Sequence, residues 1–168
     1  MTSGASKKGK PMSKKEYDNR TDLEKIQSQW NKLTGLHSRE EFSGAVVRAA
    51  TAAEIAANFA VRQEFESQSK CTEGFVNNLL RWANGIEGKL NRLLIPMTEG
   101  SKHHKTLTEV KKSVERINKK RNAVAHQGEF CNIDESNEVI DDARHFIETV
   151  VKLFDPGFKL KDKKKRKK

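Results

Sequence analysis

The chain has 168 residues, of which 35% are hydrophobic and 33% charged, and its formal net charge at pH 7 is +10. This length suffices for one domain with its own core, without disulfides or a structural metal. Cys71 and Cys131 are isolated, which excludes a disulfide framework and indicates a reducing compartment. The lysine-rich N-terminus lacks the apolar segment of a signal peptide, and no stretch has the composition of a membrane span. We therefore expect a cytoplasmic protein with no membrane partner.

The positive charge lies at the two ends of the chain. Residues 1–20 carry a net charge of +4 and residues 155–168 a net charge of +6, so residues 21–154 are neutral overall. Because runs of like charge repel, we predict disordered basic tails at 1–20 and 155–168 around a single domain at 21–154. The second tail can bind nucleic acid by counterion release, or simply keep the protein soluble. Its candidate nucleic-acid-binding residues are Lys163, Lys164, Lys165, Arg166, Lys167 and Lys168.

The first two predicted helices both begin with a capping box. The Thr-Asp-Leu-Glu string at 21–24 opens a helix that ends near Gly35. The Ser-Arg-Glu-Glu string at 38–41 opens a longer helix that reaches about Ser67. Small side chains cover more than one face of this second helix, so it either forms the centre of a bundle or lies at a subunit interface. These side chains are Ala49, Ala50, Ala52, Ala53, Ala56, Ala57 and Ala60.

Three further helices follow from the spacing of apolar residues. Thr72 caps a third helix that continues to about Leu93, and a fourth begins after 100–101 and runs to the Gly at 128. Asp134 is the predicted cap of a fifth helix, with Ile133 as a hydrophobic staple. No segment alternates as a strand would. The short connections predict an all-α fold, an up-and-down bundle of four to five helices.

Glu54 lies within the alanine-rich surface of the second helix. If that surface is buried, its carboxylate is partly desolvated and needs a cationic partner. If the alanine face is broad and solvated, Glu54 is an ordinary exposed glutamate.

The string Arg121-Asn122-Ala123-Val124-Ala125-His126 near the end of the fourth helix is the strongest functional signal. Arginine presents a planar fork that suits phosphate oxygens, and histidine can transfer a proton near neutral pH. The alternative is an ordinary helix end, where basic side chains complement the dipole and Gly128 terminates the helix. The neighbouring Lys119 and Lys120 add positive charge beside the motif and are further candidate nucleic-acid-binding residues.

Helices that lead to Arg-Asn-x-x-x-His and a glycine resemble the HEPN superfamily of small all-helical domains. Arg121 and His126, with four residues between them, match the family's Arg-x(4–6)-His motif, and Asn122 matches the polar residue that often follows the arginine. The resemblance covers residues 21–154. It departs from the antitoxin-paired branch, which has a tyrosine two positions before the histidine; here Val124 stands there. Partnership with an antitoxin therefore does not carry over, and the sequence identifies no inhibitor.

The resemblance implies a metal-independent endoribonuclease that acts as a homodimer, with RNA as substrate and no cofactor. Two facing motifs would form one cleft, in which His126 helps the ribose 2′-OH attack the phosphate and Arg121 stabilises the developing charge. Asn122 completes the catalytic set, and Glu54 and Lys120 are candidate supporting residues. A role as a toxin, in defence or in stress response, would fit such an activity. On an ideal helix Arg121 and His126 diverge by about 140°, a gap that the reach of arginine must close.

Two other functions remain open. Some members of the family are inactive and serve as binding or dimerisation modules, and the basic tails can bind nucleic acid without any catalysis. The adjacent His103 and His104 point apart on a helix and make a poor metal pair, and no phosphate-binding glycine loop is present. We expect no metal site.

Overall fold

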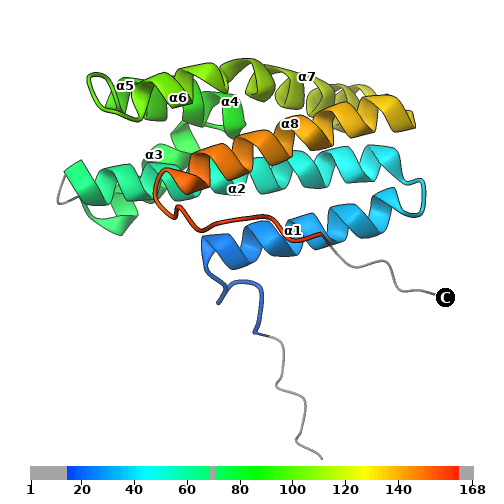
Figure 1. The fold of residues 1–168 in the computed structure, drawn as a ribbon, viewed down its shortest axis with the longest axis horizontal. Helices are drawn as coiled ribbons and strands as arrows, with labels where there is room; N and C mark the ends of the chain where they lie inside the picture. Colours follow the sequence, from blue (N-terminus) through cyan, green and yellow to red (C-terminus); the bar gives the residue numbers. More distant parts are fainter. Residues whose placement is uncertain (1–14, 69–70, 163–168) are drawn as a thin grey trace, which may run out of the picture.

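The computed structural model describes residues 15–68 and 71–162, and every regular element within these ranges is helical. The elements are α1 (Asp22–His37), α2 (Phe42–Gln68), α3 (Glu73–Trp82), α4 (Gly85–Lys89), the π-helical turn η1 (Leu90–Leu94), α5 (Ile95–Met97), α6 (His104–Glu109), α7 (Lys111–Gln127) and α8 (Ile133–Lys152). The long helices α1, α2, α8 and α7 run alongside one another (Figure 1). The predicted all-α helical bundle is confirmed.

Helix α2 is the centre of this bundle. It packs against α1, α4, α7 and α8, and seven of its alanines, at positions 45, 49, 52, 53, 56, 57 and 60, are completely buried. Side chains this small let several helix backbones approach α2 at once. The alanine surface is therefore used within the chain, and it no longer argues for a subunit interface. By length and composition α2 could cross a membrane, but 56% of its apolar window is buried inside the bundle, an environment typical of a core helix.

The start of α1 is confirmed, whereas the predicted start of α2 is wrong. Thr21 accepts a hydrogen bond from the Glu24 amide, and the Glu24 carboxylate accepts one from the Thr21 amide. Ser38 instead terminates α1, and its hydroxyl donates to the Gly35 carbonyl over 2.9 Å. The chain then turns through Glu40, whose φ is 62°, and α2 begins at Phe42. Serine can cap either end of a helix. Here the turn through Glu40 places Ser38 at the end of α1 rather than at the start of α2.

The predicted third and fourth helices are each interrupted. Thr72 caps α3 as expected, but α3 ends at Trp82 and the chain turns at Gly85, where φ is 70°. This left-handed conformation favours glycine and separates α3 from α4. The fourth helix divides at Val110 into α6 and α7. The cap of α8 is Asn132, which forms a capping box with Glu135, rather than the predicted Asp134.

The C-terminal segment 155–162 packs on α1, in contrast to the prediction of a disordered tail from residue 155. Figure 1 shows it (orange to red) returning along α1. Leu160 is buried, and the backbone of Lys161 exchanges hydrogen bonds of 2.8 and 3.0 Å with the side chain of Gln27. Trp30 donates its indole N–H to Asp162 over 3.1 Å. The charge composition of this segment gave no sign of these contacts, because the buried Leu160 stands between two lysines.

Asp162→Asn should reduce the free energy of unfolding by about 1 kcal/mol at neutral pH, because a charged acceptor for Trp30 and Arg144 is lost at a partly exposed site. Hydrogen bonds from these two donors, the one from Trp30 foremost, hold the pKa of Asp162 below its ordinary value of 3.8. The contribution is therefore present above that value and disappears as pH falls through the lower folded pKa. Urea unfolding at several pH values measures it, with Lys161→Gln as the neighbouring control. A stability gap that stays constant down to the lowest pH would contradict this assignment.

Candidate active site

The Arg-His motif occupies the last turns of α7, where the helix reaches the surface. Arg121 and Asn122 are half-buried, whereas His126 is exposed. Ala123 faces the core and fixes the rotation of the helix, so that the polar side chains point outward. The motif is thus anchored on its inner face and open to solvent on its outer face.

The structure brings the three predicted catalytic residues into contact. Arg121 Nη1 lies 3.1 Å from His126 Nε2 and donates to Asn122 Oδ1 over 2.9 Å. The long arginine side chain therefore closes the angular gap that separates positions 121 and 126 on the helix. A guanidinium can only donate, so a hydrogen bond at this contact has His126 Nε2 as its acceptor. An unprotonated ring nitrogen beside a fixed cation is suited to accept a proton next to an anionic phosphate.

Gly128 ends the motif helix with a left-handed residue. Its φ is 71°, and the amides of Gly128 and Glu129 both donate to the carbonyl of Ala123. Three residues later the Cys131 amide donates to Ser43 Oγ over 2.9 Å, which ties the α7–α8 connection to the first turn of α2. The end of α7 is therefore held by both a terminating turn and a tertiary hydrogen bond.

Lys120 is engaged in holding this connection, while Lys119 is exposed. The Lys120 ammonium contacts Glu135 at 2.7 Å and Glu129 at 3.3 Å. The hydrogen bond to Glu135 raises the pKa of Lys120, and the same contact lowers the pKa of Glu135. Lys120 thus has two carboxylates close by, which leaves its charge largely compensated and gives it a structural part in positioning the motif.

Glu54 lies away from the motif, in contact with Lys89. The two groups are 2.5 Å apart, and the Lys89 side chain is only 5% exposed. Glu54 is thus the partly desolvated carboxylate with a cationic partner that its alanine surroundings suggested. The contacts of this pair lie between α2 and α4, and they give Glu54 no link to Arg121 or His126.

His103 has a buried partner that the sequence did not indicate. Its Nδ1 lies 2.7 Å from an Oε1 of Glu64, which is 3% exposed, and its ring packs edge-on against Phe154. This pair links the end of α2 to the segment before α6. The partner is 39 positions away in the sequence, so no local pattern could have revealed it.

Two large apolar side chains lie exposed just after the motif. Phe130 is 91% exposed and Ile133 is 49% exposed, and both belong to the chain between Gly128 and the first turn of α8. The predicted staple at Ile133 would have buried that side chain, and it does not. An exposed phenylalanine beside a polar motif is a signal that the sequence already contained and that helix-pattern reasoning passed over.

Three further points concern the reactivity of Cys131, metal binding and the basic C-terminal residues. Burial raises the pKa of the Cys131 thiol, so it is a poor nucleophile. Within residues 15–68 and 71–162, no three His, Cys, Asp or Glu side chains gather as metal ligands would. The predicted nucleic-acid-binding residues 163–168 lie outside the described residues.

Comparison of the chain with protein-family models, with curated proteins and with solved structures gave no match. The geometry of the site and the resemblance of its motif therefore carry the functional interpretation.

Gly128→Ala should reduce the free energy of unfolding by about 1 kcal/mol, because an alanine Cβ disfavours the left-handed backbone. The space around the added Cβ is open, so the cost is conformational rather than steric. Gly74→Ala, on α3 with equally open surroundings, is the matched control and should be neutral or slightly stabilising. Thermal unfolding of both variants measures the difference. Equal melting temperatures would show that the end of α7 adapts without strain.

Proposed function

We propose that the protein is a metal-independent endoribonuclease of the HEPN type, acting through Arg121, Asn122 and His126. The single observation that carries this proposal is the 3.1 Å contact between Arg121 Nη1 and His126 Nε2 at an exposed helix end. A helix terminus stabilised only by its dipole requires basic side chains near the carbonyls and no contact between them. Here the cation and the proton acceptor are held together, with Asn122 accepting a second hydrogen bond from the same guanidinium nitrogen.

The chemistry follows from which atoms can move protons. His126 Nε2 accepts the proton of a ribose 2′-OH as O2′ forms a bond to the adjacent phosphorus. The bond between phosphorus and O5′ breaks, and the leaving oxygen takes a proton from a second donor. Phosphate oxygens draw the Arg121 guanidinium away from His126, which frees Nε2 and places the charge where the transition state needs it. The products are a 2′,3′-cyclic phosphate and a 5′-hydroxyl.

A second copy of the chain would supply the missing proton donor. One motif contains a single histidine, which cannot act as base and acid in the same step, so the site is incomplete in one chain. Phe130 and Ile133 support a symmetric dimer around this point, because exposed apolar side chains beside a polar site favour a protein interface. The dimer is formed by this surface in the proposal, and the alanines of α2 take no part in it.

His126→Ala should reduce RNA cleavage at least about a hundredfold, the usual size of a lost general base, with little change in melting temperature. Arg121→Lys should also lose most activity, because an ammonium cannot reproduce the fork on a phosphate. Cleavage of a defined RNA by wild type should persist in EDTA and leave cyclic phosphate ends.

His145→Ala is the matched control, since His145 is exposed on α8 and outside the motif. Wild-type cleavage by His126→Ala, with the fold intact, would leave the non-catalytic binding module as the function of this helix end.

Phe130→Asp should convert a dimer of about twice 19.1 kDa into a monomer, because two like charges would face each other across the symmetry axis. Light scattering across micromolar concentrations measures the mass, and activity should fall in parallel. Phe75→Asp, on the exposed side of α3, is the control for losing an exposed phenylalanine elsewhere. A wild-type protein that stays monomeric at every concentration would remove the composite site.

A further inference from the structure

A basic groove lies along α1, on the side where α1 meets α2 and residues 15–20. It has a volume of about 930 Å³. Its described lining includes a single carboxylate, Glu24, against five cations: Lys15, Arg20, Lys32, Arg39 and Arg48. Although residues 21–154 are neutral overall, side chains from the predicted N-terminal tail, α1 and α2 therefore form a local excess of positive charge in this groove.

Three of these cations have no carboxylate partner among the described residues. Lys15 pairs with Glu24, and Arg39 pairs with Glu41 outside the groove. Arg20, Lys32 and Arg48 take part in none of the salt bridges within 15–68 and 71–162. Within the described residues no carboxylate pairs with these charges, and Arg20 is held in place by hydrogen bonds to the Lys15 carbonyl and to Ser28 Oγ. A concave site concentrates field lines and attracts anions.

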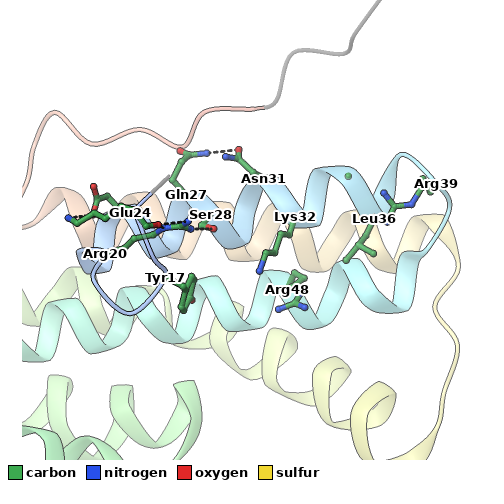
Figure 2. Close-up of a pocket in the computed structure, with 12 residues that line it drawn as sticks. Tyr17, Arg20, Glu24, Gln27, Ser28, Asn31, Lys32, Leu36, Arg39 and Arg48 are labelled. Atoms are coloured by element: carbon green, nitrogen blue, oxygen red, sulfur yellow. Dashed lines mark hydrogen bonds and ion pairs between the residues drawn. The ribbon is translucent and has the colours of Figure 1, made fainter. Parts of the chain in front are cut away.

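A polar network fixes where these charges point. Arg20 and Lys32 lie 5.5 and 5.7 Å from the centre of the Tyr17 ring, and Lys25 is held at 5.8 Å. The Tyr17 hydroxyl accepts a hydrogen bond from Gln29, which is 4% exposed, and the other end of Gln29 accepts one from Arg48. Figure 2 shows Tyr17, Lys32 and Arg48 arranged along the groove, each from a different segment. A buried glutamine and one aromatic ring thus hold like charges together in advance of any ligand.

We infer that this groove binds the phosphate backbone of a single-stranded nucleic acid. On α1 the groove is lined from Glu24 to Leu36, a distance of about 18 Å along the helix axis, which is longer than one phosphate or one nucleotide requires. Cations spaced along a groove, with an aromatic ring between them, are the arrangement that single-strand binding sites use.

The groove is separate from the Arg-His motif and acts whether or not that motif cleaves RNA. Its Arg39 end lies at the α1–α2 turn, and Ser43 at the start of α2 accepts the hydrogen bond from Cys131 in the α7–α8 connection. The turn and the connection lie at the same end of the bundle (Figure 1). A strand that follows α1 is therefore directed toward the end of the molecule that carries His126.

The test measures binding of the full chain to a fluorescent single-stranded DNA of about 12 nucleotides, within the usual site size. DNA lacks the 2′-OH, so binding is recorded independently of cleavage. The double variant Lys32→Gln, Arg48→Gln should bind about tenfold more weakly at 150 mM salt, and its salt slope should fall by about 1.4, the value for two lost phosphate contacts on a single strand. Circular dichroism checks the fold; should the double variant unfold, Lys32→Glu alone is measured, since Lys32 is exposed.

The control is Lys111→Gln, Lys112→Gln, which removes the same charge from exposed positions at the start of α7. It should keep wild-type affinity. If the two double variants lose the same affinity, the loss comes from overall charge and the proposal is overturned. Unchanged binding by the Lys32→Gln, Arg48→Gln variant would overturn it as well. Single-stranded RNA should bind as the DNA does, and a duplex of the same length that bound equally well would refute the single-strand assignment.

Discussion

The close packing around α2 is the constraint on which the rest of the structure depends. Small side chains let a helix backbone approach neighbours on several sides at short distance, and most of the buried positions of α2, which packs against α1, α7 and α8, are alanines. A larger residue at these positions would separate the helices and leave the surrounding Val, Leu and Ile side chains without contacts. The rigidity of α7, and with it the position of the Arg-His motif, follows from this central helix.

The Arg-His motif at the end of α7 is held in place on one side and open to solvent on the other. Its inner side is fixed by Ala123, by the left-handed turn at Gly128 and by the ties from Lys120 to the carboxylates beside it. Its outer side presents Arg121 and His126 to solvent, already in contact. In the proposed activity a phosphate displaces only the Arg121 side chain, and the exposed face is where a second chain of the proposed dimer would bind.

The distribution of charge has a different meaning in the folded molecule than along the sequence. Residues 21–154 are neutral overall, so the sequence placed the excess positive charge at the two ends of the chain. Folding separates the signs: acidic side chains of α8 pair with Arg116 and Lys120 of α7, whereas Arg20, Lys32 and Arg48 gather in one groove and have no salt-bridge partner among the described residues. A net charge is a sum over residues and carries no information about which of them share a surface.

Helical periodicity determined the class of fold and the approximate helices, because these depend on interactions between residues three or four positions apart. Thr21 and Thr72 were recognisable as caps for the same reason. The motif residues were predicted from their side-chain chemistry and from the resemblance of their spacing to a known family. Helix ends that depend on a turn, as at Ser38 and Gly85, were decided by the path of the backbone. The anchoring of 155–162 on α1, the Glu64–His103 pair and the basic groove all join residues that are distant in the sequence. Only the tertiary structure could decide them, since burial and charge pairing depend on which surfaces the helices bring together.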